Sequence, residues 1–193
     1  QNSFSTNVRN TLLTNKSNDI YNINYDYKTI IKILMAFEDN ELTHNEQLHI
    51  LITNLYKEQP LKEDMLEAIR KGIKFIDGGT EDEEEATKKR VYSFKKDGNY
   101  IFSGINQTHH IDLSDKVNLH WWVFLSLFMD MSSDCTFGEL VYYRKRKNEG
   151  KLTKEEKANY NKIKKLVELD ESNAKVSNEK SEFLNTWKKL NKK

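Results

Sequence analysis

The feature that most constrains the fold is an apolar run in the middle of the chain, from Asn118 to Met131. Two of the three tryptophans lie side by side in it, and nearly every residue is large and apolar, although the whole chain is 37% hydrophobic. A helix of this sequence is apolar on all sides and must be buried on most of them, whereas a strand of this length would be unusual. A membrane span needs about 20 apolar residues, and this shorter run contains His120, Ser126 and Asp130. We therefore expect a central core helix wrapped by others, with these fold-defining residues: Leu119, Trp121, Trp122, Phe124, Leu127 and Phe128.

The rest of the sequence predicts an all-α fold, a single-domain multi-helix bundle around this central helix. One proline and seven glycines in 193 residues favour long helices over turn-rich β structure. Apolar residues recur at three- and four-residue spacing in several segments. The predicted helix starts are an N-cap at Asp26, a first-turn proline at Pro60, and capping boxes at Thr43–Glu46, Thr136–Glu139 and Thr153–Glu156. Residues 20–24 alternate enough to predict a short N-terminal strand or hairpin.

We divide the sequence into three parts by composition and periodicity. Residues 1–19, rich in asparagine, serine and threonine, predict a flexible N-terminal arm. Residues 20–170 form the predicted helical domain, and residues 171–193 an amphipathic C-terminal tail helix. The apolar stripe of this tail consists of Val176, Phe183, Leu184, Trp187 and Leu190.

Residues 91–108 fit two structures. Val91–Phe94 and Asn99–Phe102 resemble the strands of a hairpin with Asp97-Gly98 as its turn. The same residues place Phe94, Ile101 and Ile105 on one face of a helix, although each helical glycine costs about 1 kcal/mol relative to alanine. The pattern alone leaves both interpretations open.

The sequence gives few candidates for catalysis or metal binding. His109, His110 and His120, with Asp112 or Asp115 beside them, could bring imidazoles to a zinc ion, but their spacing is not that of a helical zinc site. The single cysteine, Cys135, has no evident base partner and favours a reducing compartment. The acidic run at residues 80–85 is more typical of a solvated helix start than of a cation site. We therefore expect a cytosolic protein that is not an enzyme and uses no metal or cofactor.

The charge distribution leaves a second interpretation open. Residues 144–193 carry sixteen basic and eight acidic residues, a formal charge of +8, whereas residues 1–143 carry fifteen and twenty-two, a formal charge of −7. The segment Tyr142–Lys147 interleaves aromatic and basic residues, as a nucleic-acid-binding segment would. A solvated helix end explains the same pattern more simply, so a small nucleic-acid-binding protein is the alternative rather than the main hypothesis.

Several motifs together resemble the bacteriophage gene-product-fifteen family. The matching residues are Phe94–Asp97, Asn99–Phe102, Ile111–Leu113, Leu119–Leu127 with its Leu-His-Trp-Trp start, Thr136–Gly138 and Tyr143–Arg144, with Ile23–Tyr27 upstream and Tyr160–Leu166 downstream. The resemblance covers roughly residues 20–170. Family members often have alanine at the positions of Gly98 and Gly104, which favours the helical interpretation of that segment.

The resemblance implies a role in the assembly of phage tails. Members are encoded among the tail-morphogenesis genes of long-tailed phages and prophages of Gram-positive bacteria, near the tape-measure gene. It implies a tail-assembly chaperone in the cytoplasm of the bacterial host, with the tape-measure protein and tail-tube protein as partners and a homo-oligomer as a further option. The family has no established catalytic residues. The partner-binding candidates that we select are Tyr143, Arg144, Arg146, Phe183 and Trp187.

Overall fold

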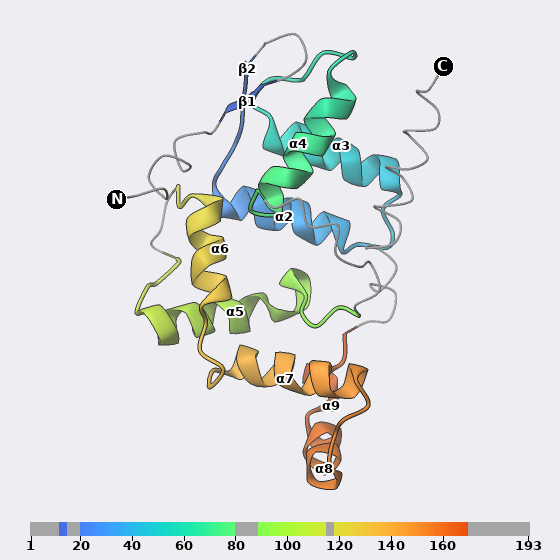
Figure 1. The fold of residues 1–193 in the computed structure, drawn as a ribbon, viewed down its shortest axis with the longest axis vertical. Helices are drawn as coiled ribbons and strands as arrows, with labels where there is room; N and C mark the ends of the chain where they lie inside the picture. The colour runs from blue at the N-terminus through green and yellow to red at the C-terminus, as the bar shows by residue number, and fades with distance from the viewer. Residues whose placement is uncertain (1–11, 15–19, 80–88, 115–117, 170–193) are drawn as a thin grey trace.

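The computed structural model describes residues 12–14, 20–79, 89–114 and 118–169, and these are mainly helical, as predicted. In chain order the elements are β1 (Leu12–Thr14), β2 (Ile20–Asn22), α2 (Tyr27–Phe37), α3 (His44–Leu55), α4 (Met65–Ile76), α5 (Phe94–His109), α6 (Trp121–Met129), α7 (Thr136–Asn148), α8 (Lys154–Lys162) and α9 (Lys164–Val167). In the described ranges the only sheet is the antiparallel pair of β1 and β2. The predicted tail helix, with Phe183 and Trp187, and most of the predicted arm lie outside the described residues. Figure 1 shows α2 to α4 at one end of the molecule and α7 to α9 at the other.

Of the three helix starts predicted before residue 65, those at Asp26 and Thr43 are confirmed and that at Pro60 is not. The Asp26 carboxylate accepts a hydrogen bond from the Lys28 amide at 2.9 Å, and the predicted capping box at Thr43–Glu46 is present. The third helix begins at Met65, so the prediction that Pro60 lies in its first turn is wrong. The Tyr21 hydroxyl accepts from the amide of Leu61 and donates to Asp64, which keeps the intervening residues in a loop beside β2.

Residues 94–109 form the helix α5, so the hairpin interpretation is wrong. Ser93 caps the helix, and the Asp97 carboxylate accepts from the Ser93 amide at 2.9 Å, which closes the first turn. The two glycines differ in what surrounds them. A Cβ on Gly104 would lie 2.8 Å from the Met131 sulfur, whereas a Cβ on Gly98 would meet nothing within 4 Å. Only Gly104 is therefore required by packing.

The apolar run forms α6, but this helix is not wrapped on most sides. It spans only nine residues, and its buried face consists of Trp121, Phe124 and Phe128. Met129 is 76% exposed, and the predicted core residues Leu119, Trp122 and Leu127 are half-buried. Figure 1 shows α6 at the edge of the molecule between α2 and α5. The prediction was wrong because an apolar sequence does not show how many neighbours a short helix has.

The inward face of α6 nevertheless joins the main core. The ring of Phe124 stacks on Tyr27 of α2 at 5.0 Å between centroids and on Trp121 at 5.5 Å. The two adjacent indoles both donate to the end of α4: Trp121 to the carbonyl of Ile76 at 2.8 Å, and Trp122 to that of Phe75 at 2.9 Å. Carbonyls in the last turn of a helix lack partners within the helix. The Trp-Trp pair therefore fixes α6 to the end of α4.

Helices α7, α8 and α9 enclose a second, smaller cluster of buried residues. Its members are Leu140, Tyr143, Tyr160 and Val167. The capping box at Thr153–Glu156 is confirmed, but α7 begins with Cys135 as its cap, so the predicted box at Thr136–Glu139 is wrong. The helix breaks at Ile163, and Leu166 beyond the break is 44% exposed. None of the helices in the described ranges is long and apolar enough to cross a membrane.

The two adjacent tryptophans are expected to differ in their contribution to stability. Trp121 is 1% exposed whereas Trp122 is half-buried. Trp121→Ala is expected to lower the free energy of unfolding by about 3–5 kcal/mol, and Trp122→Ala by roughly half of that because less area is buried. Urea unfolding followed by circular dichroism measures both. Equal losses would show that the outer side of α6 is covered after all.

Candidate functional site

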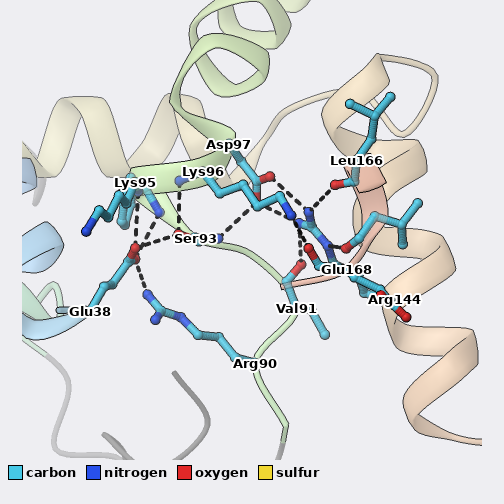
Figure 2. Close-up of polar contacts among 12 residues, drawn as sticks. Glu38, Arg90, Val91, Ser93, Lys95, Lys96, Asp97, Arg144, Leu166 and Glu168 are labelled. Atoms are coloured by element: carbon cyan, nitrogen blue, oxygen red, sulfur yellow. Dashed lines mark hydrogen bonds and ion pairs between the residues drawn. The ribbon is translucent and has the colours of Figure 1, made fainter. Parts of the chain in front are cut away.

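A buried ion pair connects the two clusters of the molecule. Asp97 lies in the first turn of α5 and Arg144 in the middle of α7, with side chains 0% and 4% exposed. The guanidinium forms a two-point contact, at 2.6 Å to one carboxylate oxygen and 2.9 Å to the other. Such fork-like pairs are the stronger and more directional kind. The pair therefore fixes the position of α7 relative to α5 (Figure 2).

Arg144 uses its remaining donors on backbone carbonyls. It donates to Val167 at 2.5 Å, to Leu166 at 3.1 Å and to Val91 at 3.2 Å. With the contacts to Asp97, these bonds employ all five N–H groups of a guanidinium. A cation at the last carbonyls of α9 is also favourable for the helix dipole. One side chain thus joins α5, α7, α9 and the segment that leads into α5.

Glu38 performs a similar task on the other side of the start of α5. Its carboxylate, 2% exposed, accepts from the Ser93 hydroxyl at 2.6 Å and from the amides of Phe94 at 2.9 Å and Lys95 at 3.1 Å. Arg90 pairs with the same carboxylate. A carboxylate at a helix N-terminus satisfies amides that have no partner within the helix. Glu38 therefore fastens the end of α2 to the start of α5 (Figure 2).

These contacts correct the prediction that Tyr143 and Arg144 bind a partner. Arg144 is saturated by internal acceptors, and Tyr143 is 7% exposed in the small cluster, with its ring 6.5 Å from that of Tyr160. Arg144 therefore has no donor left for a partner, and Tyr143 offers little accessible area. Sequence reasoning also missed Asp97 and Glu38. The four-residue spacing of Ser93 and Asp97 was a usable signal for the cap, but nothing in the sequence distinguished Glu38 from the other acids.

Several side chains of the segment Tyr142–Lys147 have partners within the protein. The Tyr142 hydroxyl donates to Glu156 at 2.6 Å, and Arg146 pairs with the same carboxylate at 3.1 Å while lying over the Tyr142 ring. Lys147 pairs with Glu168 at 3.1 Å. The hydrogen bond from Tyr142, then that from the Thr153 amide, lowers the pKa of Glu156 to about 2. Tyr142, Arg146 and Lys147 are thus engaged within the protein, while Lys145 is exposed and Tyr142 stays 48% exposed.

The histidines do not converge on one point. His109 shares a hydrogen bond with the Leu127 carbonyl at 2.9 Å, and His110 ends α5 with a φ of 55°. His120 caps α6, where its Nδ1 accepts from the Trp122 amide at 3.1 Å. Within the part of the chain that the structure describes, no three His, Cys, Asp or Glu side chains are grouped to hold a metal ion. Asp115 and the acidic run at 80–85 lie outside that part.

Cys135 is used as a helix cap. Its sulfur accepts from the Gly138 amide at 3.4 Å, and the residue is 1% exposed. It also lies against Gly104 of α5, where an added Cβ would approach the sulfur to 3.1 Å. The thiol therefore helps to set the close approach of α5 and α7.

The sequence matches a known protein family. A family model described as "Bacteriophage Gp15 protein" matches residues 9–169. The chain belongs to this family. The match includes every described helix and confirms the resemblance found from the Leu-His-Trp-Trp segment. Comparisons with curated proteins and with solved structures give no match. Membership in the Gp15 family indicates a bacteriophage protein of a structural or morphogenetic kind.

Removing either partner of the buried ion pair is expected to destabilise the protein strongly. Arg144→Ala and Asp97→Ala should each lower the free energy of unfolding by about 3–5 kcal/mol, because each leaves an uncompensated buried charge. The double variant should lose less than the sum of the two, by about 1–3 kcal/mol. The exposed pair of Lys95 and Asp39, at 3.1 Å, is the control, and Lys95→Ala should cost at most about 1 kcal/mol. Additive losses at Asp97 and Arg144 would contradict the assignment.

His120 is expected to make stability depend on pH. Burial lowers its pKa, and a protonated Nδ1 cannot accept from the Trp122 amide. Below its ordinary pKa the unfolded chain therefore binds more protons, so stability falls as the pH is lowered through about 6.5. His120→Asn keeps a capping side chain and should reduce the loss between about pH 7.5 and 5.5. Urea unfolding at both pH values, with the exposed His49→Asn as control, measures this; an unchanged loss in His120→Asn would refute it.

Proposed function

We propose that this Gp15-family protein is a non-catalytic tail-assembly chaperone that binds the tape-measure protein in the cytoplasm of the bacterial host. The observation that carries the proposal is the family match across residues 9–169. The tail-morphogenesis setting of the family supplies the client, a long protein that is prone to aggregate before the tail tube forms around it. In the second step of this proposal, the chaperone delivers the bound tape-measure protein to the tail-tube subunits.

The use of the reactive side chains supports a binding role. Arg144, Asp97 and Glu38 hold helices together, and Cys135 and His120 cap α7 and α6. The surface of the described part of the chain carries charged residues and a few large apolar side chains. The most exposed of the latter are Leu61, Phe102, Met129, Tyr142 and Leu166. Exposed apolar residues with a polar surround are typical of surfaces that bind other proteins.

Co-expression with the tape-measure protein of the same phage tests this proposal. The client alone is expected to be insoluble, and co-expression should keep it soluble and allow both proteins to purify together through a tag on either one. An unrelated helical protein of similar length is the control client. A tape-measure protein that remains insoluble and does not purify with the chain would refute the proposal.

A further inference from the structure

Two half-buried carboxylates of the C-terminal unit α7 to α9 are engaged in internal contacts. The Glu156 carboxylate accepts from Tyr142, Arg146 and the Thr153 amide. Glu168 pairs with Lys147 at 3.1 Å and accepts from the Tyr160 hydroxyl at the same distance. Of the three glutamates on or next to α8 and α9, only Glu155 is exposed to solvent without such a bond in the described structure. Of the three carboxylates on or next to α8 and α9, those of Glu156 and Glu168 are therefore bound within the protein.

The same unit leaves its cations outside. On α8 and α9, four exposed lysines pair with no carboxylate among the described residues: Lys154, Lys157, Lys162 and Lys165. Lys154 and Lys157 lie three residues apart on α8, and Lys154 to Lys162 spans about 12 Å along the helix axis. Figure 1 places α8 at the tip of the molecule, far from α2 to α4. The result is a positive, accessible surface at one end.

An apolar side chain lies within this positive surface. Leu166 of α9 is 44% exposed and directly follows Lys165 in sequence. Its carbonyl oxygen is bound by Arg144 at 3.1 Å, while its side chain points away from the polar cluster in Figure 2. The buried guanidinium thus fixes the backbone that presents Leu166. An apolar residue with a charged rim is the arrangement of a protein interface.

We infer that this surface, which we call the lysine face (Lys154, Lys157, Lys162, Lys165 and Leu166), docks an acidic helical segment of the client. The inference rests on the proposed function and names the surface that performs it. Carboxylates three residues apart on a partner helix match the spacing of Lys154 and Lys157. Leu166 supplies an apolar contact next to Lys165, and apolar contacts of this kind form the core of protein interfaces.

A protein partner fits this surface better than a nucleic acid. Tyr143 and Tyr160 are buried, and Arg146 lies over the ring of Tyr142, so in the described part of this unit the 48% exposed Tyr142 is the one ring that a base could reach. Arg144 and Arg146, the residue type suited to two-point phosphate or base contacts, are bound internally. The lysine face offers point charges and one apolar side chain instead.

Reversal of the four lysines tests the electrostatic part. In the full chain, Lys154→Glu, Lys157→Glu, Lys162→Glu and Lys165→Glu together should weaken binding of the co-expressed tape-measure protein about tenfold or more and reduce its salt dependence. The matched control reverses four exposed lysines at the other end, Lys28, Lys32, Lys57 and Lys62, with the same change in net charge. That control should bind as the unaltered chain does, with circular dichroism confirming that both variants fold.

A single substitution tests the apolar part. Leu166→Ala should weaken binding about three- to tenfold, whereas Leu61→Ala, at a leucine that is 52% exposed near the start of α4, should not. Binding by the unaltered chain that neither Leu166→Ala nor the fourfold reversal weakens overturns the inference and leaves the proposed function standing. Failure of the unaltered chain to bind overturns both. A salt-sensitive shift of labelled single-stranded DNA, lost on the fourfold reversal, would overturn the assignment to a protein partner.

Discussion

The buried contact between Asp97 and Arg144 is the interaction on which the arrangement of the molecule depends. The main core and the small cluster of α7 to α9 are separate groups of buried residues that meet at α7, whose Phe137 belongs to the main core. The guanidinium adds five directional bonds to this apolar packing, and a shift of α7 or α9 would leave a buried charge without its partner. Burying both charges is itself costly, so the net contribution of the pair to stability is smaller than the loss expected when one partner alone is removed.

The start of α5 is the common point of these polar contacts. Glu38 binds it from α2, and Asp97 closes its first turn and binds Arg144 on α7. Helix N-termini favour negative charge, so two carboxylates stand close together here without mutual cost because each has its own cation, Arg90 or Arg144.

The sequence predicted what is determined locally and failed where distant residues decide. Capping boxes at Thr43–Glu46 and Thr153–Glu156, whose partners lie three residues apart, were confirmed, whereas the same pattern at Thr136–Glu139 was not, because Cys135 caps α7 one residue earlier. Pro60 was misplaced because Tyr21, some forty residues earlier, holds the loop that precedes α4. Arg144 stands in a run of cations, and its acceptor Asp97 lies 47 residues away, so no local pattern separated it from its neighbours. The residue chosen as a binding group was therefore the most buried cation of the run.

The Leu-His-Trp-Trp segment identifies the family but lies apart from the proposed binding surface. His120 caps α6, and the two indoles bind consecutive carbonyls at the end of α4, so three adjacent residues secure one helix junction. Such a junction tolerates little change, which makes the segment a good marker of the family and a poor place for a client. The lysine face has the opposite properties: its lysines form no internal pairs with described carboxylates. Substitutions there alter charge without disturbing either cluster, so the partner can change while the fold remains.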